Sequence, residues 1–155
     1  MPAAENLALA RKFNELYNLH SSDPTWLDQI DALVTDDFTS VDIPTGVTTH
    51  GKQEFKRYFQ GWATAFSDGR IEITSAAATD DMSVVEFIGR GTHDGPLSGP
   101  AGDIPPTGKH AEVRYCSVSR FVNGKVSESR LYYDALSILT QLGVIAAPAT
   151  AQARG

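Results

Sequence analysis

Hydrophobic and polar residues alternate along this chain with two periods, first that of a helix and later that of a strand. Between residues 4 and 20, apolar positions recur at helical spacing and predict an amphipathic first helix. A second apolar stripe, over residues 26–33, follows Asp23 and Pro24. Asp23 is a good N-cap and Pro24 suits the first helical position, so a short second helix is expected there.

A third helix is predicted over residues 52–65, where aromatic residues fall at i, i+3, i+4 and i+7. These residues are Phe55, Tyr58, Phe59 and Trp62. Such spacing places all four rings on one wide stripe of the helix surface. We expect this stripe to pack against a sheet.

The strand period appears at 38–43 and dominates from residue 70 onward. Alternating patterns predict further strands over 70–79, 83–93, 109–122 and 126–133. Asn123-Gly124 predicts a tight hairpin between the last two, because both residues tolerate positive φ. A long loop rich in glycine and proline, 94–108, separates the middle strands, and its glycines leave open whether it moves as a lid.

The order of the elements predicts the fold class. Helices come first and a run of antiparallel strands follows, which favours α+β over a doubly wound α/β fold. A short helix over 135–142, stopped by Gly143, ends the pattern. The natural arrangement lays the aromatic stripe of the third helix across the concave face of the sheet.

Composition narrows the classes of partner. The chain has 155 residues, which favours one domain, and its net charge of −6 argues against binding nucleic acid or an anionic membrane. No stretch approaches the length of a membrane span, and the first residues do not read as a signal peptide. The single cysteine, Cys116, excludes an intrachain disulfide and favours a reducing, cytoplasmic setting. Residues 146–155, rich in alanine, are expected to form a flexible tail.

Several short motifs then follow one another in a familiar order. They are GKQE at 51–54, AFSD at 65–68, GTHDG at 91–95, PTGK at 106–109, NGKVSE at 123–128 and DALSILTQLG at 134–143. Together they resemble the SnoaL-like polyketide cyclase family of the nuclear transport factor 2-like superfamily. The resemblance extends from about residue 4 to residue 143.

The resemblance implies a cone in which three N-terminal helices pack on a strongly bent, mainly antiparallel sheet, formed by a domain over residues 1–145. It implies a cofactor-independent acid/base enzyme, a polyketide cyclase or isomerase-like protein acting on a hydrophobic carbonyl compound. Family members commonly form dimers, so a homodimer is expected. Arg130 departs from the family, because many relatives have a tryptophan there, and it would add a cation to the pocket.

The last strand carries the predicted catalytic residues. Glu128, Arg130, Tyr132 and Asp134 share one parity, so their side chains project to the same face. The family's matching aspartate acts in the pocket as a general acid/base, which assigns this role to Asp134. Two simpler interpretations stay open: the charged set is a solvent-exposed face, or Asp134 is the N-cap of the C-terminal helix.

The expected chemistry is proton abstraction from a carbon next to a carbonyl group. Burial would raise the pKa of Asp134 and make it a stronger base. A second group must donate a hydrogen bond to the enolate oxygen, and His93, Arg130 and Tyr132 are the candidates.

The sequence also predicts residues that bind the ligand, and it does not predict a metal site. Aromatic side chains wall pockets for apolar ligands, and polar ones join them. The predicted set is Tyr17, Phe59, Trp62, Arg114 and Tyr132. No His, Asp or Glu spacing matches a metal site, although Asp36, Asp37 and Asp42 could be imagined as a carboxylate trio.

Three alternative functions remain open. An epoxide hydrolase of the limonene type would pair Asp134 and Glu112 with an arginine, Arg130 or Arg114. A non-catalytic protein would bind a small lipid-like molecule in the same pocket. A purely structural module would use its open sheet face to dimerise.

Overall fold

The computed structural model of the chain describes residues 2–99 and 102–146, so the predicted flexible tail lies outside the described residues except for Ala146. Four α-helices and one 3-10 helix accompany eight strands in this part of the chain. The helices are α1 (Ala3–Glu15), η1 (Leu16–Leu19), α2 (Ile30–Leu33), α3 (Gly51–Ala65) and α4 (Ala135–Gln141).

The first predicted helix is present, but it tightens into the 3-10 turn η1 for its last residues. The second is shorter than predicted, because residues 24–29 form turns and only α2 is helical. Asp23 explains the difference: its carboxylate accepts hydrogen bonds from the backbone N–H (2.9 Å) and the hydroxyl (2.7 Å) of Thr25. This local turn competes with a helix start, so the prediction of Asp23 as an α-helix N-cap was wrong.

Six strands form one bent sheet in the order β2-β1-β8-β7-β4-β3, and two more form a small hairpin. The sheet strands are β1 (Val34–Asp42), β2 (Thr48–His50), β3 (Arg70–Ala78), β4 (Met82–Thr92), β7 (His110–Val122) and β8 (Lys125–Tyr133). The hairpin joins β5 (Leu97–Gly99) to β6 (Gly102–Ile104). All neighbours are antiparallel except β1 and β8, which run parallel. This is the α+β, nuclear transport factor 2-like architecture that the sequence predicted.

Three details of the strands differ from the sequence prediction. The first strand begins at Val34, not at Phe38, and continues through a register shift between Val34 and Thr39. The short strands β2, β5 and β6 were not predicted, because each has only three residues within a loop rich in glycine, proline or threonine. The predicted hairpin turn is confirmed, with φ of 51° at Asn123 and 75° at Gly124.

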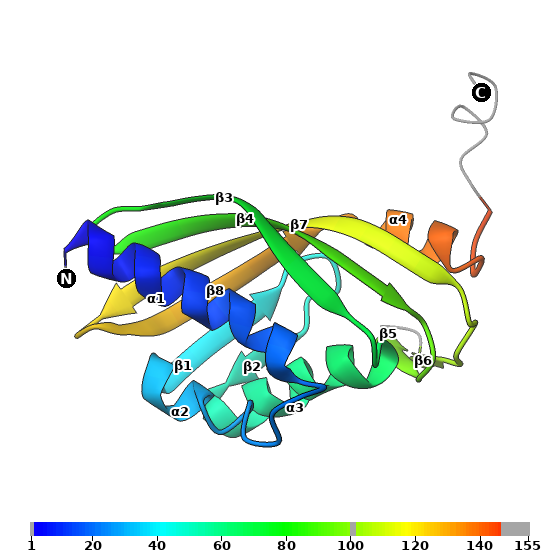
Figure 1. Cartoon of the computed structure of the whole chain (residues 1–155), viewed down its shortest axis with the longest axis horizontal. Coiled ribbons are helices and arrows are strands. Elements are labelled where there is room, and N and C mark those ends of the chain that lie inside the picture. The colour runs from blue at the N-terminus through cyan, green and yellow to red at the C-terminus, as the bar shows by residue number, and fades with distance from the viewer. Residues whose placement is uncertain (1, 100–101, 147–155) are drawn as a thin grey trace.

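Helix α3 lies across the concave face of the sheet, with α1 and α2 on the same side (Figure 1). Its Phe55 contacts Phe13 of α1 and Phe38 of β1, with ring centroids 5.7 and 5.0 Å apart. The aromatic stripe therefore packs as the sequence predicted and joins the helices to the sheet in one core.

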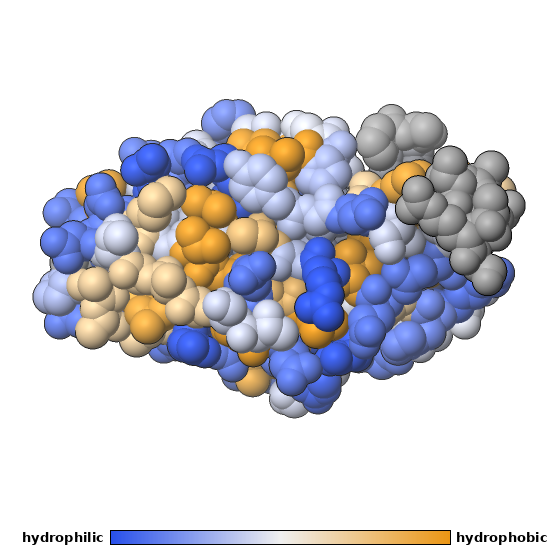
Figure 2. Space-filling view, turned by 90° about the horizontal axis from the view of Figure 1, so that it is seen from above, coloured by the Kyte–Doolittle hydropathy of each residue, from blue (hydrophilic) through white to orange (hydrophobic). Residues whose placement is uncertain are grey.

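The opposite face of the sheet is not covered by these helices. Figure 2 shows apolar groups on it separated by hydrophilic ones. Val84, Val122 and Tyr132 are exposed there, among charged neighbours such as Arg114 and Arg120. Within residues 2–99 and 102–146, no helix is long and apolar enough to cross a membrane.

Candidate functional site

Two adjoining hollows lie between α3 and the sheet. An apolar cavity of about 110 Å³ is enclosed by α1, α3 and the inward face of the strands, and a wider groove of about 660 Å³ lies between α3, the β1–β2 turn, the β5–β6 hairpin and α4. Both are lined by Tyr58, Trp62 and Ile138. Concave sites walled by aromatic side chains suit apolar ligands.

Two glycines on β4 let aromatic side chains pack closely against this strand at the cavity wall. Gly89 and Gly91 occupy inward positions on this strand and line the cavity. A Cβ at Gly89 would lie 2.7 Å from the Tyr115 ring, and a Cβ at Gly91 would lie 3.0 Å from Phe66. The packing around both glycines therefore leaves no room for a side chain.

Asp42 is the buried carboxylate of this site. It ends β1, lines the groove and is only 3% exposed, and it is the single buried Asp or Glu in the part of the chain that the structure describes. The turn after β1 fixes it, because its backbone N–H donates to the Val47 carbonyl and its carbonyl accepts from Gly46, both at 2.8 Å. None of the ion pairs among the described residues includes Asp42.

Two tyrosines hold the Asp42 carboxylate. The hydroxyl of Tyr58, on α3, donates to Oδ2 at 2.7 Å, and that of Tyr133, at the end of β8, approaches the two oxygens at 3.0 and 2.9 Å. Such donors offset the cost of burying a carboxylate away from water. Burial, followed by the charge of Asp42, raises the pKa of both tyrosines, so each phenol stays protonated at neutral pH.

Tyr115 stands beside this group with an uncommitted hydroxyl. Its ring centroid lies 5.1 Å from that of Tyr133 and 6.0 Å from that of Trp62, and it lines the apolar cavity. Among the described residues its hydroxyl has no hydrogen-bond partner. Burial raises its pKa, with smaller contributions from Tyr17 and Asp42, so it remains a hydrogen-bond donor.

The predicted catalytic face of β8 points away from this site. Ser129 and Leu131 line the cavity and Tyr133 lines the groove, whereas Arg130 and Tyr132 lie on the outer face of the sheet. The expectation that the charged parity turns inward was therefore wrong. On the outer face Arg130 donates to the Tyr132 hydroxyl and to Glu128, each at 3.2 Å, as expected for polar side chains in contact with water.

Asp134 lines neither hollow. It is exposed and is the N-cap of α4, where its carboxylate accepts a hydrogen bond from the Ser137 backbone N–H at 3.0 Å. The N-cap role is one of the two simpler interpretations that the sequence left open. The catalytic role of Asp134 stays a prediction. The groups expected for epoxide hydrolysis are not brought together, because Glu112 pairs with Arg90 on the outer face and Arg114 is exposed there.

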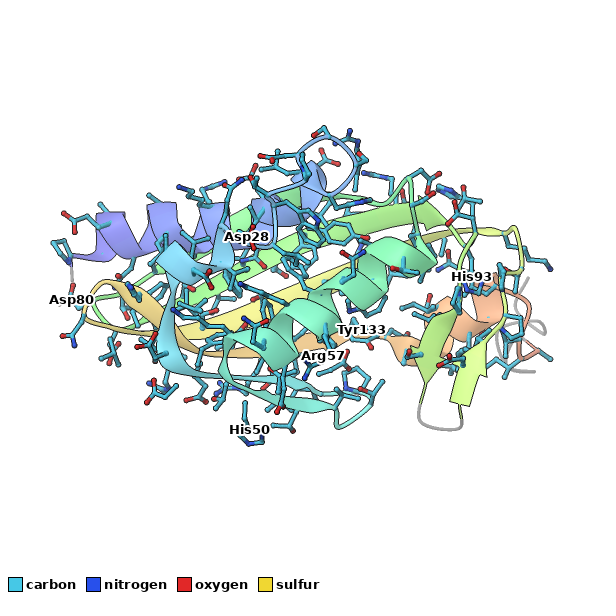
Figure 3. All side chains as sticks on the ribbon, turned by 90° about the horizontal axis from the view of Figure 1, so that it is seen from below. Asp28, His50, Arg57, Asp80, His93 and Tyr133 are labelled. Atoms are coloured by element: carbon cyan, nitrogen blue, oxygen red, sulfur yellow. The ribbon has the colours of Figure 1, made fainter. Side chains whose placement is uncertain are left out.

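His93 is fully buried at the base of the loop that carries the β5–β6 hairpin, away from Tyr133 (Figure 3). Its Nδ1 accepts a hydrogen bond from the Thr107 backbone N–H at 3.2 Å, and its Nε2 has no partner within the described ranges. His93 lines neither hollow, and its hydrogen bond with Thr107 holds the loop. Burial lowers its pKa, which keeps the ring neutral.

The predicted ligand-binding aromatics lie where the sequence placed them. Tyr17, Phe59 and Trp62 all line the apolar cavity, although ligand binding itself stays a prediction. Arg114 and Tyr132, from the same set, lie outside. Sequence reasoning missed the Asp42 group, yet a signal was present: Asp42 shares the parity of Phe38 and Ser40, which are buried on the same strand.

Comparison with known proteins bears on the fold and the family. The chain superposes on a proposed SnoaL-like polyketide cyclase from Jannaschia sp. CCS1 with a TM-score of 0.79, at 20% identity over 94% of this chain and 95% of that one. It superposes on AclR, a proposed hydroxylase from Streptomyces galilaeus, with a TM-score of 0.74, at 23% identity over 98% and 92%. For IdmH, a proposed polyketide cyclase from Streptomyces antibioticus, the TM-score is 0.67, at 22% identity over 87% and 98%.

At these identities the superpositions establish the fold alone. No curated protein sequence matches the chain. The sequence model of the SnoaL-like polyketide cyclases, however, matches residues 8–142, which is most of the chain. The chain therefore belongs to the SnoaL-like polyketide cyclase family.

Proposed function

We propose that the protein is a cofactor-independent acid/base enzyme that removes a proton from a carbon next to the carbonyl group of a hydrophobic compound, with Asp42 as the base. One observation carries the proposal: a buried carboxylate that forms no ion pair among the described residues lines the groove and is held by Tyr58 and Tyr133. The family match and the superposed cyclases support the reaction class.

In the proposed step, an oxygen of Asp42 takes the proton, and the electron pair of the C–H bond forms the enolate. The carbonyl oxygen gains negative charge and accepts a hydrogen bond from Tyr115, which lines the adjoining cavity and whose hydroxyl has no other partner among the described residues. Asp42 then returns the proton to carbon, or the enolate carbon attacks a second carbonyl group to close a ring and Asp42 gives its proton to the alkoxide oxygen that forms. Tyr58 and Tyr133 orient the carboxylate by their hydrogen bonds before the substrate enters.

The step is testable as exchange of α-hydrogens in D2O, with 1-tetralone as the neutral ketone and mass spectrometry as the measurement. Replacement of Asp42 by Asn keeps the volume but removes the base. We expect Asp42→Asn to lower the enzyme-catalysed exchange rate by about a hundredfold or more, the usual contribution of a general base. Asp134→Asn is the matched control, because Asn is an equally good N-cap, and it should leave the rate within about twofold.

The opposite pattern, with exchange lost in Asp134→Asn and kept in Asp42→Asn, would restore the sequence prediction and overturn this proposal. Quenching of tryptophan fluorescence reports binding separately, because Trp62 lines both hollows. Binding of the ketone by the wild type without any exchange would instead identify a non-catalytic binding protein. The groove would then hold its ligand while Asp42 serves only the tyrosine network.

A further inference from the structure

Arg57 is the one cationic residue among the described residues that line the groove. The other charged residues there are Asp42 and Glu54. Arg57 lies on α3, one residue before Tyr58, and its side chain is exposed. Figure 3 shows Arg57 and Tyr133 near one another beside α3, and both line the groove. A ligand that contacts Asp42 in the groove therefore shares the groove with this guanidinium group.

The two carboxylates of the groove are already committed to other donors. Asp42 accepts from two phenols, and Glu54 accepts from the His50 backbone N–H at 3.0 Å, at the start of α3. By contrast, no acceptor within residues 2–99 and 102–146 lies within hydrogen-bond or ion-pair distance of the Arg57 side chain. The guanidinium group thus keeps its donors free for a planar anion, which it can bind through two parallel hydrogen bonds.

The remainder of the groove wall is largely apolar. Val47, Leu97, Ile104 and Leu139 contribute to it from four different elements or turns. A ligand that matches this wall has a flat hydrophobic body and carries its charge at the end that faces Arg57. We propose that the groove binds a hydrophobic aromatic anion, a carboxylate or sulfonate, with its anionic group on Arg57. The proposal adds an acidic group to the substrate class of the proposed function. It rests on that function only for the end of the ligand that reacts at Asp42.

Two fluorescent dyes test the proposal directly. 8-Anilinonaphthalene-1-sulfonate and N-phenyl-1-naphthylamine share the same aromatic body and differ in the sulfonate group. We expect Arg57→Gln to weaken binding of the sulfonate by about fivefold, the effect of losing roughly 1 kcal/mol from a partly exposed ion pair. Binding of the neutral dye should change by less than about twofold on the same affinity scale. Added NaCl should weaken only the binding of the sulfonate.

Two further variants make the result specific to this position. Arg114→Gln removes an exposed arginine from the outer sheet face and should affect neither dye. Gly61→Asp places a carboxylate one helical turn after Arg57, at a position where a Cβ meets no atom within 4 Å, and should reproduce the loss for the sulfonate. Circular dichroism of each variant checks that it is folded.

The proposal is overturned if the wild type does not bind the sulfonate, if Arg57→Gln leaves its affinity unchanged, or if both dyes are weakened equally. Because these are binding measurements, they stand apart from the exchange assay. Loss of exchange in Asp42→Asn with no dye discrimination would support the base and remove the anion site. Dye discrimination without exchange in the wild type would support the anion site and remove the base.

Discussion

Two aspartates in this chain show how surroundings decide the role of a side chain. Asp42 is buried and accepts hydrogen bonds from two phenols, whereas Asp134 is exposed and accepts one from a helix N-terminus. Their immediate sequences do not separate them, since both lie at the end of a strand. Only the first position offers a buried carboxylate at the wall of a groove, where a ligand can meet it.

The capping role of Asp134 gives a prediction about stability. Asp134→Ala should lower the free energy of unfolding by about 1 kcal/mol, because the Ser137 N–H loses its acceptor. Asp134→Asn should change the free energy of unfolding by roughly a few tenths of a kcal/mol at most, since Asn caps equally well. Urea denaturation followed by circular dichroism measures both values. Equal destabilisation by the two variants would mean that the charge, and not the hydrogen bond, stabilises α4.

At the scale of elements, the strongest local patterns predicted the structure best. The aromatic stripe of α3 and the Asn123-Gly124 turn appear as expected, because each depends on residues close together in the chain. The short strands β2, β5 and β6 were missed, since three residues carry no periodic signal. The second helix was overestimated because the local turn at Asp23 competes with it.

Two glycines near the C-terminal part of α3 should respond oppositely to alanine. Gly61 is exposed on α3 and an added Cβ meets nothing within 4 Å, so Gly61→Ala should stabilise the protein by about 0.5–1 kcal/mol. At Gly95 an added Cβ would lie 2.1 Å from the Thr64 carbonyl oxygen, at the C-terminal end of the same helix. Gly95→Ala should therefore destabilise it by about 1–3 kcal/mol.

Thermal or urea unfolding of the two alanine variants side by side tests this contrast. The same substitution is made in both, so differences in the chemistry of alanine cancel. A stabilised Gly95→Ala variant would show that the loop after β4 does not pack on α3 as described. A destabilised Gly61→Ala variant would show that the groove face of α3 is closed at this point.

At the scale of the whole molecule, the site depends on a contact that local patterns do not reveal. The parallel pairing of β1 with β8 brings Asp42 beside Leu131 and within reach of Tyr133, 91 residues away along the chain. Parity could show which residues of a strand share a face, but it could not show which face turns inward. For this reason the charged set on β8 was assigned to the wrong side. The cavity wall was predicted correctly for Tyr17, Phe59 and Trp62, because they also pack in the core.

The stability of the whole fold should depend on pH through His93. Its Nδ1 accepts from the Thr107 backbone N–H, so a proton on Nδ1 would break the hydrogen bond that holds the loop below β4. Burial lowers the pKa of His93 in the folded protein below its ordinary value of 6.5, and the nearby carboxylate of Asp94 opposes this only in part. The unfolded chain therefore binds a proton first as the pH falls, and the fold loses stability from about pH 6.5 down to the folded-state pKa.

His93→Asn isolates this contribution, because the Asn Oδ1 can replace Nδ1 as the acceptor but does not titrate. The variant should be less stable than the wild type at pH 7.5, since a buried ring is lost. It should also lose less stability between pH 7.5 and 5.5, with a difference in slope of at most about 1.4 kcal/mol per pH unit. The other histidines contribute equally to both proteins and cancel in the comparison. Parallel pH dependences in urea denaturation would show that His93 keeps its ordinary pKa in the fold and that the loop does not depend on its neutral form.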